Sequence, residues 1–197
     1  MRWDRAVHHV EALARSCAAM ADNPVSSLRV TQLWAVGDIL GPAMDLEVVT
    51  VALCVNLPPE DVAWWTEPRG TGHWAQATRL TKNPILAWWR SDRAPVWNHR
   101  IVRPALVWDA AEGEHGEVLA ALAEGKGESV RTGAPAEQEY VSRLQQELAV
   151  SRDALRAASA TYDARRWGQG KLESIADPLW RAADGYLDVL DATKQKP

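Results

Sequence analysis

Two acidic residues, Asp45 and Glu47, stand just before an apolar run from Val48 to Val55. In an extended chain, residues two apart point to the same side and lie about 7 Å from each other. Two carboxylates placed in this way repel each other unless a cation or an arginine lies between them. Mg²⁺ is typically held by one or two carboxylates together with substrate phosphates. The spacing therefore predicts a divalent metal site.

Strands are the elements expected to position these acids. The segments Val30 to Val36 and Val48 to Val55 are rich in Val and Leu and are bounded by Gly and Pro, which is typical of buried strands. Val96 to Trp108 is also expected to be extended, with Pro104 indicating an edge strand or a bulge. Asp109 then lies at the end of a strand.

This pattern resembles the nucleotidyltransferase superfamily, in particular the minimal and aminoglycoside nucleotidyltransferases, over about residues 1–110. The resemblance rests on a strand that ends in glycine (Val36-Gly37), a short connector, and an acid-x-acid pair that opens the next strand. It implies that Asp45, Glu47 and Asp109 are the catalytic residues and the Mg²⁺ ligands. It also implies that a nucleoside triphosphate is bound, for which the candidate residues are Gly37, Asp38, Arg79, Lys82 and Arg90.

The chain departs from the family pattern after Gly37. Asp38 stands where the family has Ser or Gly, and its charge would repel a triphosphate. The connector between Gly37 and Asp45 is also shorter than is usual in the family. We therefore expect a degenerate nucleotidyltransferase-like protein that acts as a nucleotide-binding or regulatory module. The alternatives are an active Mg²⁺-dependent nucleotidyl transferase and an unrelated α+β protein-interaction protein.

Tryptophan and basic residues alternate between Pro68 and Trp108, where seven basic residues accompany one acid, Asp92. Arginines that neutralise phosphates and tryptophans that stack on bases are typical of sites for nucleotides or single-stranded nucleic acid. The chain contains no Phe, so these tryptophans also suit a hydrophobic core whose arginines reach out to water. The pattern leaves both interpretations open.

The overall composition is that of an ordinary globular protein, with 47% hydrophobic residues and a net charge of −4. The charge offers no general support for nucleic-acid binding. No apolar run approaches the roughly 20 residues needed to span a bilayer, and the first residues are charged, unlike a signal peptide. We expect a cytoplasmic protein with no membrane association, and buried, reduced thiols at Cys17 and Cys54.

The remaining pattern is helical and completes a predicted α+β fold, in which helices flank a mixed sheet. Periodic apolar residues predict helices over residues 2–21, 73–80, 112–124 and 136–166, with 85–90 continuing a helix. Asp177-Pro178 is expected to begin a last helix. Residues 1–124 would form the nucleotidyltransferase-like domain, 125–135 a linker, and 136–197 a helical hairpin. The hairpin's near-heptad stripes make it a candidate homodimer surface.

Overall fold

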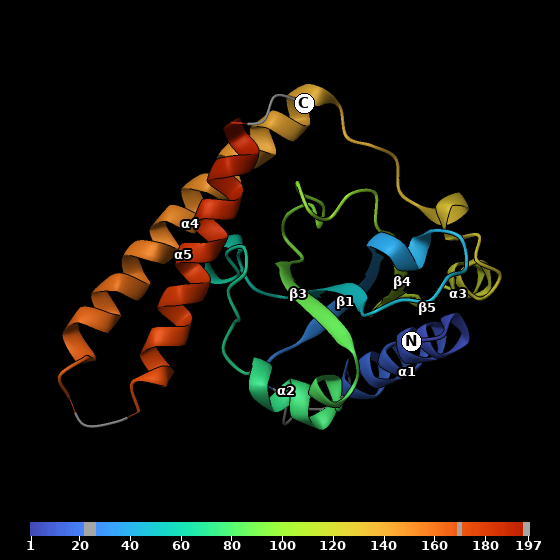
Figure 1. Ribbon diagram of the computed structural model, residues 1–197, viewed down its shortest axis with the longest axis horizontal. Helices are drawn as coiled ribbons and strands as arrows, with labels where there is room; N and C mark the ends of the chain where they lie inside the picture. The colour runs from blue at the N-terminus through green and yellow to red at the C-terminus, as the bar shows by residue number, and fades with distance from the viewer. Residues whose placement is uncertain (22–26, 169–170, 195–197) are drawn as a thin grey trace.

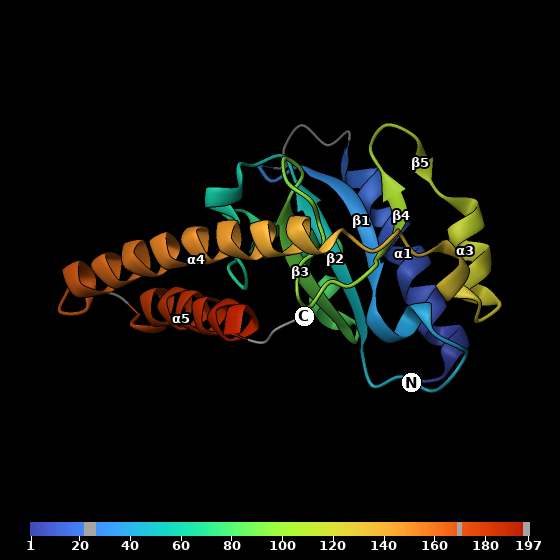
Figure 2. The ribbon, with the colours of Figure 1, turned by 90° about the horizontal axis from the view of Figure 1, so that it is seen from above.

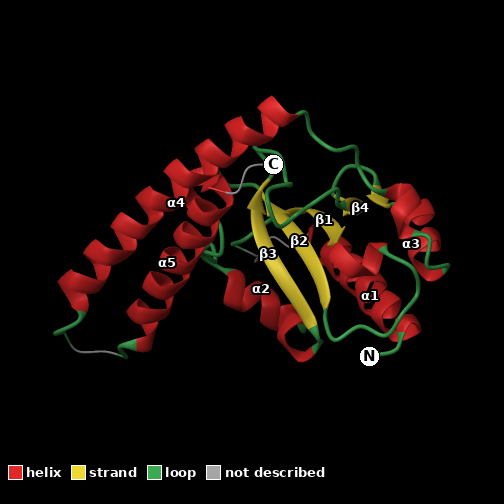
Figure 3. Ribbon diagram, turned by 45° about the horizontal axis from the view of Figure 1, so that its top comes forward, coloured by secondary structure: helices red, strands yellow, loops and turns green. Residues whose placement is uncertain are grey.

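A mixed five-stranded sheet lies at the centre of the structure, a computed structural model that describes residues 1–21, 27–168 and 171–194. The strands are β1 (Val30–Val36), β2 (Val49–Val55), β3 (Ile85–Ser91), β4 (Ala105–Asp109) and β5 (Gly113–Glu114). Their order is β3-β2-β1-β4-β5. β2 and β3 run parallel, and the other neighbouring pairs are antiparallel. The expected α+β fold with a mixed sheet and a C-terminal helical pair is confirmed (Figure 3).

Alternating side chains of the central strands supply two separate cores. Leu33 and Val51 point into the first core, whereas Val36 and Cys54 point into the second. This is the two-residue period of a strand that is buried on both faces. The periodicity explains why Val- and Leu-rich runs formed strands at nearly the predicted bounds.

Three helices cover the first face of the sheet. They are α1 (Trp3–Ala21), α2 (Thr71–Ala77) and α3 (Gly116–Ala123), and all three contribute to the first core. The predicted helix over residues 2–21 is confirmed, and it buries Val10, Leu13 and Cys17. Short 3-10 helices complete this part of the chain at η1 (Gly37–Leu40), η2 (Pro59–Asp61), η3 (Leu80–Lys82) and η4 (Gly127–Val130).

The second face is covered by the loop of residues 92–104 and by a helical hairpin. The hairpin consists of α4 (Glu137–Arg165) and α5 (Glu173–Lys194), which pack along each other and extend beyond the sheet as an arm (Figures 1 and 2). Val96 and Ile101 of the loop join Val189 of α5 in the second core, with Leu148 of α4 packed against it. The sheet and the hairpin therefore share a core.

Three predicted elements were wrong in type or position. Residues 85–90 form strand β3 instead of a helix, because Trp88 and Trp89 enter opposite cores and the segment pairs with β2. Of the predicted extended segment 96–108, residues 105–108 are in β4, and the part before it is loop. The last helix begins at Glu173, so Pro178 lies inside it. Among the described residues, no helix combines the length and the apolar character needed to cross a bilayer.

Candidate functional site

Asp45 and Glu47 lie in the connector before β2, and both are exposed, with Leu46 buried between them. Gly37 and Asp38 follow β1 at the same end of the sheet, because Val36 pairs with Thr50. Asp38 is also exposed. The backbone between Asp45 and Glu47 is tied to the start of the chain, since Leu46 N donates to Met1 O at 2.9 Å.

Asp109 lies at the opposite end of the sheet from these acids. β4 runs antiparallel to β1, which pairs Asp109 with Gln32 near the beginning of β1. Asp45 and Glu47 precede β2, and the first residues of β2 lie beside Val36, at the other end of β1. The expectation that the three carboxylates form one metal and catalytic site is therefore corrected by the strand directions.

Asp109 belongs instead to a cluster with Glu112 and His115. The possible ligand atoms of these three residues lie within 4.8 Å of one another, which is close enough to hold a metal ion. Among the described residues, no other group of three or more His, Cys, Asp or Glu meets this condition. Asp109 Oδ1 accepts hydrogen bonds from Ala111 N (2.8 Å) and Glu112 N (2.9 Å), and Oδ2 lies 2.8 Å from His115 Nε2. These bonds close the turn between β4 and β5.

Hydrogen bonding explains the acidity of Asp109. Burial alone would raise its pKa, but hydrogen bonds from Glu112 N, His115 and Ala111 N hold the pKa below its ordinary value. Both carboxylate oxygens of Asp109 thus stabilise the turn between β4 and β5. This structural role accounts for the cluster of Asp109, Glu112 and His115 without a metal ion.

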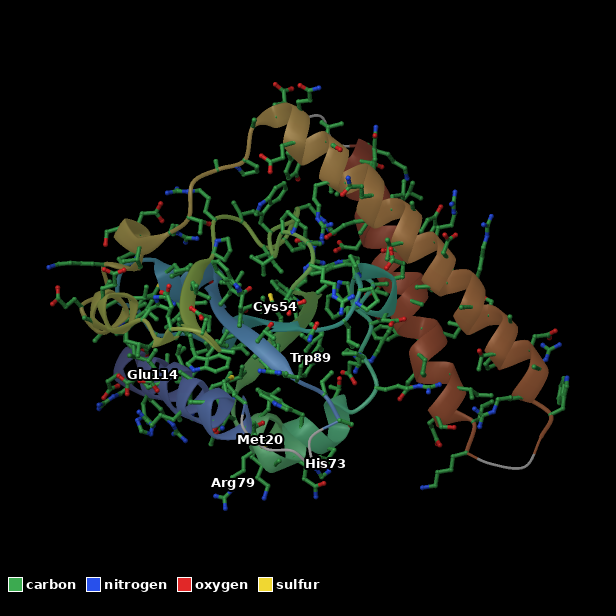
Figure 4. The ribbon with its side chains drawn as sticks, turned by 180° about the vertical axis from the view of Figure 1, so that it is seen from behind. Met20, Cys54, His73, Arg79, Trp89 and Glu114 are labelled. Carbon is green, nitrogen blue, oxygen red and sulfur yellow. The ribbon has the colours of Figure 1, made fainter. Side chains whose placement is uncertain are left out.

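The residues expected to bind a nucleotide are separated as well. Arg79 and Lys82 are exposed beside α2 and η3, and Arg79 points outward at the edge of the molecule (Figure 4). Gly37 has a φ of 72° and offers its carbonyl to Arg131 Nη2 at 3.2 Å. Arg90 pairs with Cys54 towards the far end of β2 and is buried. The structure does not bring these residues to one site.

Arg90 is the centre of a buried polar network. Its guanidinium forms an ion pair with Glu147 of α4 and donates to Val96 O at 3.1 Å. Glu147 also pairs with Arg143 (2.9 Å) and accepts a hydrogen bond from Asn98 Nδ2 (3.1 Å). Burial alone would raise the Glu147 pKa, but the two arginines and these hydrogen bonds lower it. Arg90 is thus used to dock α4 and is not available to a phosphate.

Asp188 of α5 makes a second polar joint between the hairpin and the sheet domain. It accepts a hydrogen bond from Trp64 Nε1 at 2.8 Å and lies 2.8 Å from His99 Nε2. Arg100 completes the cluster with an Nε to Oδ1 distance of 3.2 Å. Like the Arg90 network, this joint uses basic residues of the segment from Pro68 to Trp108, called the Trp-rich segment below, to hold a helix.

Most tryptophans of the Trp-rich segment fill the cores. Trp74, Trp89 and Trp108 are buried in the first core, and Trp88 packs against the second. Core packing therefore explains these four residues. Trp97 differs from them, because it is half-buried and lines a cavity.

This cavity has a volume of about 440 Å³ and lies between the loop of residues 92–104 and the segment that enters α4. Its wall is mainly apolar and includes Trp97, Ile101, Val102, Pro135 and Tyr140. The Trp97 and Tyr140 rings lie 14° from parallel with their centroids 6.5 Å apart. Small-molecule sites typically have this character, with an apolar wall and a few polar groups.

Apart from the aromatic residues, three lining residues carry polar side chains, and they differ in how far other groups of the protein already hold them. Asn98 is engaged within the protein, since its Oδ1 accepts from Arg100 N and Ile101 N while its Nδ2 donates to Glu147. Arg103 Nη1 contacts Glu128 at 2.7 Å, on the exposed surface. Glu137 is exposed, and no ion pair holds it within the described residues.

A family model matches residues 1–195, and its description is a domain of unknown function, DUF7711. The chain belongs to this family. No curated protein and no solved structure matches the chain. The family match spans the sheet domain, the segment 125–135 and the hairpin, so the cavity and the two polar joints all lie within it.

The residues of the cavity and the joints were not recognised as such from the sequence. Tyr140 lies within the periodic pattern that predicts the helix over residues 136–166, and Trp97 lies within the Trp-rich pattern between Pro68 and Trp108. One local signal was present, because Glu147 falls between Leu144 and Ser151 on the inward face of α4. An acid on the buried face of a helix indicates a buried basic partner, although the sequence does not say which one.

Proposed function

We propose that this protein is a binding module for a planar heterocyclic ligand, such as the base of a nucleotide, and that the ligand enters the cavity beside Trp97 and Tyr140. The observation that carries the proposal is the pair of nearly parallel rings in the wall of the 440 Å³ cavity. This proposal keeps the expected nucleotide-binding role and moves it to a different part of the molecule.

The two rings offer aromatic surface on which a flat ligand can stack. The Trp97 and Tyr140 rings lie 14° from parallel with their centroids 6.5 Å apart, and both line the cavity. Stacking of a base on an aromatic side chain contributes about 1–3 kcal/mol.

The charged lining residues favour a ligand with a polar edge and an anionic group. Arg103 Nε donates to Thr132 O at 3.2 Å, and its Nη1 pairs with Glu128 on the surface, where exchanging an exposed partner costs little, so the Nη groups are available to a phosphate. Glu137 offers a carboxylate to N–H groups of a heterocycle. A nucleotide carries both kinds of group.

Binding without transfer agrees best with the positions of the acids. Two-metal catalysis needs carboxylates that converge on ions about 4 Å apart, whereas Asp109 lies at the other end of the sheet from Asp45 and Glu47. We therefore expect ligand binding to be independent of Mg²⁺.

Isothermal titration calorimetry in EDTA tests the proposal with adenosine, guanosine, uridine and their 5′-triphosphates. We expect at least one of them to bind, and Trp97→Ala and Tyr140→Ala each to weaken that binding about 5- to 150-fold, which corresponds to one lost stacking contact. Trp167→Ala is the matched control, because Trp167 is 86% exposed beyond the far end of α4. Absence of binding at millimolar ligand, or binding that neither cavity variant weakens, would contradict the proposal.

A second assay separates binding from catalysis. The wild-type protein is incubated with Mg²⁺ and radiolabelled ATP, and label transfer to acceptor hydroxyls is measured. We expect none. Transfer that disappears in the Asp45→Asn/Glu47→Gln variant would show that the predicted acids are catalytic and that a binding role alone is wrong.

A further inference from the structure

The outward face of α5 carries a regular stripe of acidic and large apolar residues. Successive members are separated alternately by four and three residues, which places them on one line along a helix. From Glu173 to Asp191 this line is about 27 Å long at 1.5 Å per residue. Its members are Glu173, Asp177, Trp180, Asp184, Leu187 and Asp191; below they are called the α5 stripe.

Two members of the stripe are large apolar side chains in contact with solvent. Trp180 is 60% exposed and Leu187 is 53% exposed. They are one heptad apart, so they lie one above the other on the same face. Exposed apolar side chains of this size that line up and are bordered by polar residues mark interaction sites.

The opposite face of α5 is already occupied. Ala182, Gly185 and Val189 are buried there, and Gly185 approaches Trp64 so closely that a Cβ atom would come 2.2 Å from the Trp64 carbonyl oxygen. The arm projects from the sheet domain in Figure 2. The α5 stripe is thus turned away from the surface that docks the hairpin.

The acids of the stripe have few basic neighbours. Within the described residues, Glu173, Asp177 and Asp184 are in no ion pair, and Asp191 contacts Lys194 at 2.9 Å. Arg181 of the same helix is directed to Glu67 at 2.9 Å. The stripe therefore presents uncompensated negative charge on both sides of Trp180 and at one side of Leu187.

We propose that the α5 stripe is a docking surface for a cationic amphipathic helix of another protein. Apolar residues of such a helix would cover Trp180 and Leu187, and its Lys or Arg residues would face the neighbouring carboxylates. A second copy of the same face is a poor partner, because a two-fold contact places like charges opposite each other. This surface is separate from the proposed ligand cavity.

The α4 part of the near-heptad stripes, on which the predicted dimer rests, is used within the chain. Leu144 is buried and Leu148 packs against the second core, so these α4 residues are used within the chain. The α5 stripe lies on a face of the hairpin that intramolecular packing leaves uncovered.

A synthetic peptide provides the test. The probe is a fluorescent 18-residue Lys/Leu peptide whose leucines line one helical face, and the control peptide has the same composition in an order that disperses the leucines. We expect anisotropy titration of the full chain to show saturable binding of the probe that weakens as salt is raised. Trp180→Ser/Leu187→Ser should weaken it about 30-fold or more. Trp167→Ser, which removes an exposed Trp outside the stripe, should leave it unchanged.

The charge component has its own variant. Asp177→Asn/Asp184→Asn should weaken probe binding and reduce its salt dependence, while circular dichroism and the melting temperature stay those of the wild type, because Asp177 is exposed, Asp184 is half-buried, and neither forms an ion pair within the described residues. Equal binding of the two peptides, or binding that survives Trp180→Ser/Leu187→Ser, would overturn the proposal. Sedimentation that detects a dimer lost in Trp180→Ser/Leu187→Ser would also overturn it, since the occupant would then be a second copy.

Discussion

Arg90 of β3 and Glu147 of α4 form an ion pair inside the protein, with side chains that are 3% and 5% exposed. The two residues are 57 positions apart in the chain. Arg143 and Asn98 supply further contacts to Glu147, and the Arg90 guanidinium also lies 5.5 Å from the centroid of the Trp64 ring. This network and the Asp188 cluster are two of the polar contacts that orient the hairpin on the sheet.

Removing the Glu147 charge should strongly destabilise the protein. In Glu147→Gln, Arg90 and Arg143 would stay buried without a counter-charge, and breaking a buried pair in this way costs about 3–5 kcal/mol. Urea unfolding measures the change. Glu139→Gln on the exposed face of α4 is the control, with an expected change within about 0.5 kcal/mol. A loss below about 1 kcal/mol in Glu147→Gln would show that the network does not hold the hairpin.

Asp188 should make stability depend on acidity. Burial would raise its pKa, but hydrogen bonds from Arg100, Trp64 and His99 hold the pKa well below its ordinary value. Because the folded-state pKa is depressed, the contribution of Asp188 is complete above the unfolded-state pKa of about 3.9 and is lost as the pH falls below it. Unfolding free energies at pH 7, 5 and 3.5 measure this. The drop between pH 5 and 3.5 should be smaller in Asp188→Asn, and an unchanged drop would contradict the assignment.

The close approach of α5 to the Trp64 loop should make Gly185 intolerant of a side chain. The Cβ of Gly185→Ala would lie 2.2 Å from the Trp64 carbonyl oxygen and 3.0 Å from its carbonyl carbon. Overpacking of this kind costs about 1–3 kcal/mol, which thermal or urea unfolding detects. Gly116→Ala is the control, since a Cβ there meets nothing within 4 Å and Gly116 is helical. Equal stability of the two variants would mean that α5 sits farther from the sheet domain.

The exposed acids before β2 should not respond to Mg²⁺. Asp45 and Glu47 lie apart from Asp109, so Asp45→Asn/Glu47→Gln should change the unfolding free energy by less than about 0.5 kcal/mol. Differential scanning fluorimetry with and without 10 mM MgCl₂, at matched ionic strength, measures the response. A metal-dependent rise in melting temperature that is lost in the double variant would restore the predicted metal site, because binding to the folded state alone stabilises it.

Local patterns were sufficient to predict several elements from the sequence. The side chains of Val30–Val36 and Val49–Val55 point alternately into two apolar cores. The buried apolar residues of α1 recur every three to four residues. Such patterns depend on side-chain periodicity alone, which a short window contains. The long helix and the existence of a C-terminal hairpin followed from the same kind of signal. The buried, free thiols of Cys17 and Cys54 followed from their apolar surroundings and are confirmed.

The positions of the chemically interesting groups depended on long-range pairing. Whether Asp109 meets Asp45 depends on the direction of β4 beside β1, and no local pattern encodes that direction. Arg90 had the sequence context of a phosphate ligand but became a buried counter-ion, because folding brings Glu147 to it. A buried charge needs a partner more than a surface charge does. Tertiary structure therefore decided which basic residues serve the core, and it also formed the cavity that Trp97 and Tyr140 line.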